Sequence, residues 1–181
     1  GSMAYSRTLQ QVSRHDATVA VTVGAHSSIG MRGLLLFGTA EQKDRFLGGI
    51  AQGRTIVTPA LVDAGSRNPL NPSAVAEPNG ADWSVSGRFS NVAYADRAER
   101  ILAPARTARG SIVVLLVDPK AERVRLGEQR GTNGQPLWLL ELDRAPVAAV
   151  DVLGGAEHGE QVLRYLVDRT DLAICAVEYG I

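Results

Sequence analysis

Apolar residues along the chain follow two different periods. Over residues 4–53 and 156–179 they recur at intervals of three to four positions, which is typical of amphipathic helices. Over residues 54–152, short runs rich in β-branched and aromatic residues alternate with turn residues, which is typical of strands. The pattern therefore predicts helices, then strands, then a last helix.

Capping residues mark where the first helices begin. Asp16 precedes the apolar stretch ATVAVTVGAHSSIGMRGLLLF, and Gly38 ends it. Thr39 and Gln42 then have the spacing of a capping box, in which each side chain bonds the other residue's backbone N–H. The glycines inside the apolar stretch lower its helix propensity and allow a neighbouring element to approach closely. We expect two consecutive helices here.

Turn signals divide the middle part into strands. Asn79-Gly80 separates the runs SAVAEP and ADWSVSG, as in a short hairpin, and Asp118-Pro119 ends the most apolar run, SIVVLLVD. Asn133-Gly134 predicts a further turn. Strands at roughly ten-residue spacing favour a small antiparallel barrel or sandwich.

The last helix carries an apolar stripe, on which Cys175 is expected to fill the core. We predict an α+β fold of three parts: a helical segment at 1–53, a middle antiparallel β-domain at 54–152 and the start of a second helical domain at 153–181. The stripe consists of Val162, Leu163, Leu166, Val167, Ile174 and Val177.

Composition narrows the classes of function. Lys plus Arg and Asp plus Glu each total 19, so the formal net charge is zero, whereas nucleic-acid binding needs a clustered basic face. The single cysteine excludes an internal disulfide, and we find no apolar run approaching the roughly 20 residues of a membrane span. We expect a soluble cytoplasmic protein that binds neither nucleic acid nor membrane. The Gly-Ser pair before Met3 is typical of the scar left by removal of an expression tag.

Residues with metal-binding or nucleophilic chemistry do not cluster along the sequence. The three histidines are scattered and distant from Cys175, so we expect no metal site. Neither a G-x-S-x-G motif nor a P-loop motif occurs. The best candidate for an anion site is the segment PALVDAGSRNP, 59–69, where a Gly-Ser turn follows a strand and can present backbone N–H groups. From the residues alone, a plain turn and an anion site both remain open.

Several stretches resemble the acyl-CoA dehydrogenase family. LLLFGTAEQKDRFLGGIAQGRTI is similar to the family's FGteeQKerfLpplasGe, and ALVDAGS stands where the family has ALTEPxAGSD. WSVSGRFSNVAYADRAERILAPART stands where it has a strand with G-x-K-x-W-I-T-N, and APVAAVDVLGGAEHGEQVL follows v-r-V-P-x-x-x-v-L-G-x-x-g-x-G. Family members have an N-terminal helical domain, a middle β-domain and a C-terminal four-helix bundle. The resemblance covers about half of a usual member, so we expect this chain to begin late in the first domain and to end early in the third.

The resemblance implies an FAD site in the middle domain. The family removes the α and β hydrogens of an acyl thioester: a carboxylate takes the α proton and flavin N5 takes the β hydride. By resemblance, the backbone at Leu61 and Val62 runs along the flavin, and Ser66 bonds the FAD pyrophosphate. Val92 and Ala93 then face the isoalloxazine ring.

Several of these positions lack the family's functional groups. Val62 replaces a threonine whose hydroxyl bonds the flavin, and residues 91–93 are Asn-Val-Ala in place of Trp-Ile-Thr. Thr170 stands where some members place the catalytic glutamate. One lost aromatic stack and two lost hydrogen bonds cost about 1 kcal/mol each. We therefore predict that this chain alone binds FAD weakly and lacks the family's base.

The resemblance also implies an acyl tunnel beside the first long helix. His26 stands where the family usually has a small residue, so it is expected to shorten or polarise this tunnel. Asp63 and Tyr94, on the flavin side, and His26 itself are candidate acids or bases. Simple packing or solvent exposure of all these residues remains the alternative. The predicted substrate-binding residues have the i, i+3, i+4, i+7 spacing of one helix face: Thr22, Ala25, His26 and Ile29.

Three functions remain open. In the first, the chain is a dehydrogenase component that binds an acyl-CoA and needs a complementary chain for the base and part of the flavin site. Alternatively, it is a flavin-free enzyme, such as a cyclase or isomerase, that keeps the pocket for a small apolar ligand, or it is a non-catalytic partner subunit. Because a chain that stops inside a helical bundle leaves its last apolar stripe uncovered, we expect a homodimer or a heteromer formed through the last helix.

Overall fold

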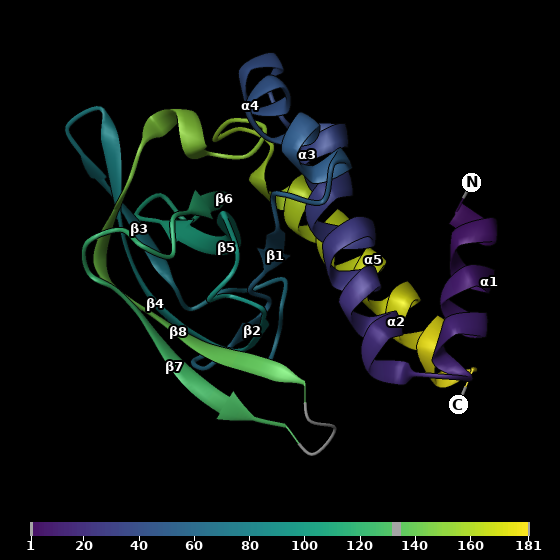
Figure 1. Ribbon diagram of the computed structural model, residues 1–181. Helices are drawn as coiled ribbons and strands as arrows, with labels where there is room; N and C mark the ends of the chain where they lie inside the picture. The colour runs from purple at the N-terminus through teal and green to yellow at the C-terminus, as the bar shows by residue number, and fades with distance from the viewer. Residues whose placement is uncertain (1, 132–134, 181) are drawn as a thin grey trace.

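The computed structural model describes residues 2–131 and 135–180 (Figure 1), and it confirms the predicted α+β fold. The turn predicted at Asn133-Gly134 lies outside these residues. The helical elements are α1 (Ser2–Ser13), α2 (Ala17–Val23), the π-helix η1 (Gly24–Gly30), α3 (Met31–Phe37), α4 (Ala40–Ala51), the 3₁₀-helix η2 (Ala149–Asp151) and α5 (Gly159–Glu178). The strands are β1 (Val57–Pro59), β2 (Val62–Asp63), β3 (Val75–Asn79), β4 (Asp82–Ala93), β5 (Arg100–Thr107), β6 (Ile112–Val117), β7 (Val124–Arg130) and β8 (Pro136–Val147).

The predicted helix caps are present. The side chain of Asp16 accepts a hydrogen bond from the backbone N–H of Val19 at 3.0 Å. In the capping box, the Gln42 N–H donates to Thr39 Oγ1 at 3.2 Å, and the Thr39 N–H donates to Gln42 Oε1 at 3.1 Å. The amide of Gln42 also donates to the carbonyl oxygen of Val152 at 2.9 Å, so this residue fixes α4 against the chain that follows β8.

The strands form one curled sheet with the order β1-β5-β3-β4-β8-β7, to which β2 adds through β4 and β6 adds through β5. The predicted hairpin is the antiparallel pair β3–β4, whose Asn79 and Asp82 face each other across a two-residue turn. The prediction of a wholly antiparallel sheet is wrong in two places, because β1 and β3 both run parallel to β5. Parallel pairs need a connection that crosses back over the sheet, and turn signals do not reveal such connections.

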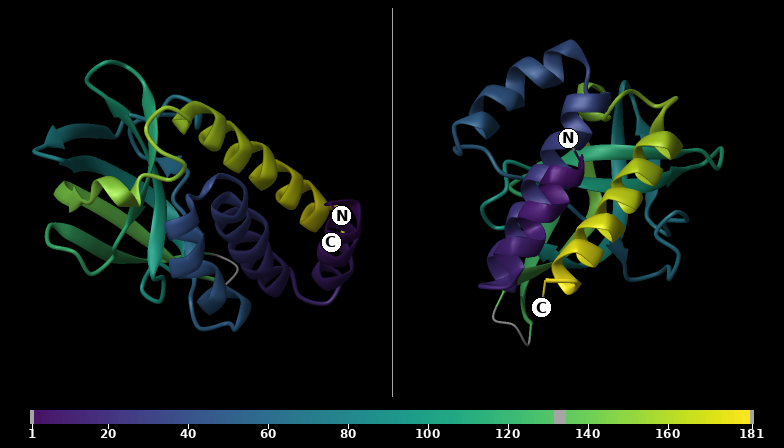
Figure 2. Two further views of the ribbon diagram at one scale, coloured as in Figure 1. Left: turned by 90° about the horizontal axis from the view of Figure 1, so that it is seen from above. Right: turned by 90° about the vertical axis from the view of Figure 1, so that its right-hand side faces the viewer.

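The core has two parts that share β5 and β6. Side chains alternate between the two faces of a strand, so Ile101 and Leu115 lie inside the curled sheet, whereas Leu102 and Leu116 face the helices. All six residues of β6 are buried, since both of its faces are covered. The helices therefore pack on one side of the sheet, as Figures 1 and 2 show.

The apolar stripe of α5 is mostly covered within the chain. Val162, Leu163, Leu166, Val167 and Val177 are buried, mainly against β6, η1, α2 and α1. The expectation that this stripe lies bare within the chain is therefore wrong, whereas the homodimer or heteromer predicted from it stays a prediction. Its premise was that the covering helices come only from the part of the fold that follows α5, whereas helices that precede the sheet in sequence also cover it.

The placement of Cys175 was also predicted wrongly, because its side chain is exposed. Cys175 is nine residues after the buried Leu166. At 100° per residue, nine residues turn a helix by two and a half revolutions, so the two side chains point in opposite directions. Cys175 was assigned to the apolar face because its neighbours in sequence are hydrophobic, but the helical period places it on the opposite face.

The continuous helical stretch Ala17–Phe37 is, by length and composition, long and apolar enough to cross a membrane, so the prediction that no apolar run approaches this length is wrong. In the fold it packs against α1, α5 and β1 (Figure 2). A Cβ at Gly30 would lie 2.1 Å from the carbonyl oxygen of Val57, so glycine is required for this close approach of helix and strand. In this fold the stretch is only partly buried, and four of its large apolar side chains are exposed: Val19, Val23, Leu35 and Leu36.

Candidate functional site

A cavity of about 280 Å³ lies between the helices and the open edge of the sheet. Its wall is apolar except for a few polar side chains, and none of the described residues that line it is charged. We call it the main cavity. It is lined by Ala20 and Val21 of α2, Gly24, Ala25 and Ile29 of η1, Thr58 and Pro59 of β1, Leu61 and Val62, Asn91 and Ala93 of β4, Gln135 and Leu137, and Thr170, Ala173, Ile174 and Val177 of α5.

The main cavity brings together five of the residues predicted from the sequence. Two of the predicted substrate-binding residues, Ala25 and Ile29, approach from the helical side. Three of the predicted cofactor-binding residues, Leu61, Val62 and Ala93, approach from the sheet. Residues about 30 to 70 positions apart in sequence thus line one apolar space.

A smaller cavity of about 250 Å³ adjoins the main cavity and is lined by the remaining substrate-side residues, Thr22 and His26. Its wall shares only Ala25, Thr58 and Ala93 with the main cavity. The four predicted substrate-binding residues are thus divided between two adjoining cavities, with Ala25 in both. Residues 24–30 form a π-helix with i→i+5 bonds, which holds more residues in each turn than the α-helical period on which the prediction was based.

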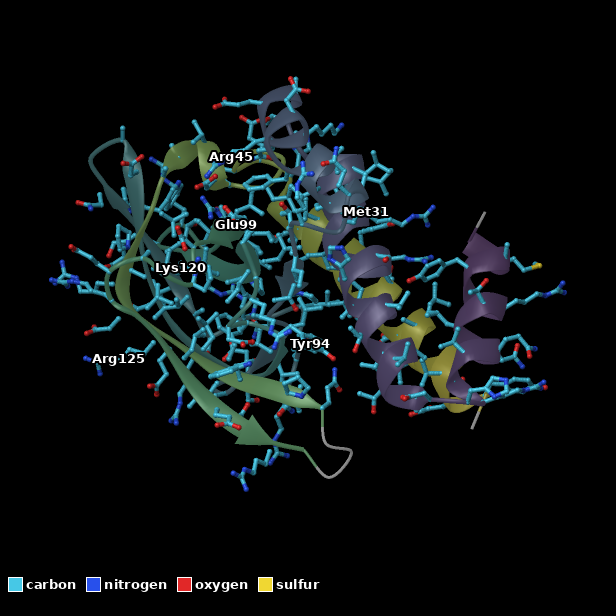
Figure 3. The ribbon with its side chains drawn as sticks, in the orientation of Figure 1. Met31, Arg45, Tyr94, Glu99, Lys120 and Arg125 are labelled. Carbon is cyan, nitrogen blue, oxygen red and sulfur yellow. The ribbon has the colours of Figure 1, made fainter. Side chains whose placement is uncertain are left out.

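Tyr94 lines the smaller cavity, and its hydroxyl lies 2.8 Å from Thr22 Oγ1. Figure 3 shows Tyr94 in the space between the strands and the helical layer. The hydroxyl of Thr22 in turn donates to the carbonyl oxygen of Thr18 at 2.8 Å. Across the cavity wall, the buried Nδ1 of His26 has no hydrogen-bond partner among the described residues.

Asp63 lines neither cavity. It is buried, and its carboxylate accepts hydrogen bonds from the N–H groups of Gly65 (2.8 Å), Ser73 (2.6 Å) and Ala74 (3.3 Å) and from the hydroxyl of Ser73 (2.5 Å). Four donors on one carboxylate hold the loop 63–74 together. The geometry gives Asp63 a structural role, and it does not support the prediction of an acid or base at this residue.

The Gly-Ser turn after Asp63 has its own donors engaged. The Gly65 N–H is bonded to the Asp63 carboxylate, and the Ser66 N–H lies 3.4 Å from the Asp63 carbonyl oxygen. The Ser66 hydroxyl donates to the carbonyl oxygen of Asn68 at 3.1 Å and accepts from its N–H at 3.2 Å. Arg67 is exposed. The sequence left a plain turn and an anion site open, and the observed bonds are those of a closed turn.

Residues 91–93 end β4 with a bulge. The pairing of β4 with β8 shifts between Phe89 and Val92, and Asn91 has a left-handed φ of 57°. The Asn91 N–H donates to Gln129 Oε1 at 2.8 Å. Val92 is fully buried inside the curled sheet and lines neither cavity, although it was predicted to face the flavin ring. The bulge turns Asn91 and Ala93 toward the main cavity and Val92 away from it.

Known proteins match this chain over most of its length. The family profile "Acyl-CoA dehydrogenase, N-terminal domain" matches residues 1–54. The mitochondrial very long-chain specific acyl-CoA dehydrogenase of Bos taurus is 37% identical over 97% of this chain and 29% of its own length. Acyl-CoA dehydrogenase FadE28 of Mycobacterium tuberculosis is 32% identical over 80% of this chain and 39% of its own.

The chain belongs to the acyl-CoA dehydrogenase family. The glutaryl-CoA dehydrogenase of Mycobacterium smegmatis, solved in complex with FADH2, has the same fold, with a TM-score of 0.86 and 20% identity over 95% of this chain and 45% of that one. The chain thus spans between about a third and a half of the length of these three relatives.

Thr170, the position at which some acyl-CoA dehydrogenases place their glutamate, lines the main cavity. Its hydroxyl donates to the carbonyl oxygen of Leu166 at 2.8 Å, within α5. Neither carboxylate nor imidazole occurs among the described residues of this cavity wall, so in this chain the wall offers no group that would take a proton at neutral pH.

The contribution of α5 to the cavity was not predicted from the sequence. The spacing of the lining positions, 170, 173, 174 and 177, repeats every three to four residues, so continuing the stripe of α5 through its small members would have found them. Ile174 was expected in the core but is 47% exposed, because it lies at the edge of this cavity. Among the described residues, no group of three or more His, Cys, Asp or Glu side chains is placed to hold a metal.

Proposed function

We propose that this chain binds an acyl thioester in the main cavity as a component of an acyl-CoA dehydrogenase. The observation that carries the proposal is the common wall formed by Ala25 and Ile29 from the helical side and Leu61, Val62 and Ala93 from the sheet. An apolar space with few polar groups suits an acyl chain, because burial of each methylene contributes about 0.8 kcal/mol.

We further propose that this chain alone holds FAD weakly. The donors expected to meet the pyrophosphate, at Gly65 and Ser66, are bonded to Asp63 and Asn68. At the ring, Val62 and Ala93 present methyl groups where the family has hydroxyls. The residues of this chain therefore fit the cofactor poorly.

Dehydrogenation accordingly depends on a second chain that supplies the base and much of the flavin site. The uncharged wall around Thr170 supports this inference, because abstraction of an α proton needs a positioned base. The closed Gly-Ser turn also supports a second candidate, a flavin-free or non-catalytic subunit that retains only the acyl cavity.

Two titrations test the proposal. Isothermal titration of the chain with octanoyl-CoA is expected to show saturable binding to one site, whereas titration with FAD, followed by flavin fluorescence, is expected to show little. Ala173→Phe fills the main cavity and should abolish octanoyl-CoA binding. Leu172→Phe changes the adjacent residue, which is 54% exposed and does not line the cavity, and should preserve binding.

Equal binding of octanoyl-CoA by the two variants would place the ligand elsewhere and refute the proposal. Tight stoichiometric binding of FAD by the unmodified chain would refute the statement on the cofactor. Adding candidate partner chains then separates the two functions: acyl-CoA dehydrogenation by the mixture supports the dehydrogenase component, and its absence with every partner supports the flavin-free subunit.

A further inference from the structure

The two cavities are separated by a thin wall of small side chains. Ala25 from η1, Thr58 from β1 and Ala93 from β4 line both spaces, and two of the three carry only a methyl group. The main cavity has an apolar wall, whereas the smaller cavity is lined by polar residues as well: Thr22, His26, Ser27, Tyr94 and Arg97. A ligand that extends from the main cavity past Ala25 and Ala93 thus meets polar groups at its far end.

The Tyr94 hydroxyl is held with its oxygen free to accept a hydrogen bond. Thr22 has one hydroxyl hydrogen, and it is directed to the carbonyl oxygen of Thr18 at 2.8 Å. The 2.8 Å contact between Thr22 and Tyr94 is therefore donated by Tyr94. Tyr94 also has a left-handed φ of 53°, a costly conformation for a tyrosine that tends to be kept where a side chain must be aimed.

His26 offers the complementary group. Its Nδ1 is buried and lacks a hydrogen-bond partner among the described residues, and a buried polar atom without a partner costs free energy. In the tautomer with hydrogen on Nδ1 it donates, while the Tyr94 oxygen accepts. A hydroxyl group can do both at once, since it carries one hydrogen and two lone pairs.

We propose that the smaller cavity binds a hydroxyl group at the far end of the acyl ligand, which donates to Tyr94 Oη and accepts from His26 Nδ1. The inference rests on the proposed acyl-thioester site, and it adds the substrate class: acyl chains that carry a hydroxyl remote from the thioester. An apolar cavity would reject such a ligand, because a buried hydroxyl without a partner is unfavourable.

The test compares matched pairs of ligands. Hexanoyl-, octanoyl-, decanoyl- and dodecanoyl-CoA are titrated calorimetrically against the chain, each beside its ω-hydroxy counterpart. For at least one chain length, the hydroxylated ligand is expected to bind at least as tightly as the unsubstituted one. Tyr94→Phe and His26→Ala should each shift the ratio of the two dissociation constants by about tenfold against the hydroxylated ligand.

Two matched controls change the same residue types elsewhere. Tyr179→Phe changes a tyrosine that is 81% exposed and lines neither cavity, and His15→Ala changes an exposed histidine, so both should leave the ratio within about twofold. Thermal unfolding of each variant reports whether it is folded, and the ratio within one variant is insensitive to a general loss of affinity.

The outcomes separate the two proposals. If no acyl-CoA binds, the proposed acyl-thioester site fails and the inference falls with it. If the unsubstituted ligands bind but every hydroxylated one binds about tenfold more weakly, or if Tyr94→Phe leaves the ratio unchanged, the inference alone is overturned.

Discussion

The carboxylate of Asp63 accepts two hydrogen bonds from Ser73, one from its backbone N–H at 2.6 Å and one from its hydroxyl at 2.5 Å. This pair joins the end of β2 to the chain that enters β3, ten residues later. An acidic residue beside a Gly-Ser turn therefore serves as the turn's internal anion.

Asp63→Asn is expected to lower the free energy of unfolding by about 1–3 kcal/mol, because one oxygen becomes an N–H₂ group that faces buried donors. Urea unfolding measures the loss. Asp44→Asn, on an exposed side chain of α4, is the matched control and should change stability by less than about 0.5 kcal/mol. A neutral result at Asp63 would mean that the four hydrogen bonds do not hold the loop.

The bulge at Asn91 limits how the flavin site can be restored. We predict that Val62→Thr, Asn91→Trp and Ala93→Thr together raise FAD affinity, measured by flavin fluorescence. Asparagine tolerates the left-handed φ of 57°, whereas tryptophan there should cost about 1–2 kcal/mol of stability. The double variant Val62→Thr/Ala93→Thr avoids this cost, and it should match the triple variant in affinity only if the aromatic ring contributes nothing.

Gly30 and Gly48 form a matched pair for testing helix packing. Alanine at position 30 would place a Cβ 2.1 Å from the Val57 carbonyl oxygen, whereas at position 48 it would meet nothing within 4 Å. Gly30→Ala should lower stability by about 1–3 kcal/mol, since η1 must move away from β1. Gly48→Ala should raise it by about 0.5–1 kcal/mol through helix propensity. Equal effects in thermal unfolding would contradict the close approach of η1 and β1.

Burial raises the pKa of Tyr5 above its ordinary value of 10.0, and a hydrogen bond with Ser27 and the charges of Arg169 and Arg32 offset part of this rise. The protonated phenol is thus favoured in the folded state. Its contribution to stability is complete below about pH 10 and is lost as the pH rises through the folded-state pKa.

Tyr5→Phe should therefore reduce the loss of stability above pH 10, followed as the unfolding midpoint in denaturant between pH 8 and pH 11. Tyr179→Phe, on a side chain that is 81% exposed, is the matched control and should retain the alkaline loss. An unchanged alkaline slope in Tyr5→Phe would exclude Tyr5 as its source.

Most elements of the fold were predictable from local sequence signals. The cap at Asp16, the capping box of Thr39 and Gln42, and the β3–β4 hairpin are decided by neighbours within four residues, so the sequence revealed them. The parallel pairing of β1 and β3 with β5 depends on contacts between distant segments. Such pairings are fixed by how the sheet curls, which no local pattern encodes.

The site was predictable in part for the same reason. Family resemblance named residues on both walls of the main cavity, but it did not predict the second, adjoining cavity, in which Thr22 and His26 lie together with Ala25. The chemistry of Asp63 depends on donors brought to it by the fold. A carboxylate in a sequence does not show whether its lone pairs are already in use.

Strands β5 and β6 pack one face against the helices and the other against the inside of the curled sheet. Each of the two hydrophobic core clusters therefore contains residues of these strands. Cutting the chain between α4 and β1 would separate the helices α1 to α4 from the strands against which they pack, so apolar side chains of both pieces would become exposed. The helices are thus expected to melt together with the sheet in a single transition, and a truncation that removes α1 to α4 should yield an insoluble sheet rather than a smaller folded protein.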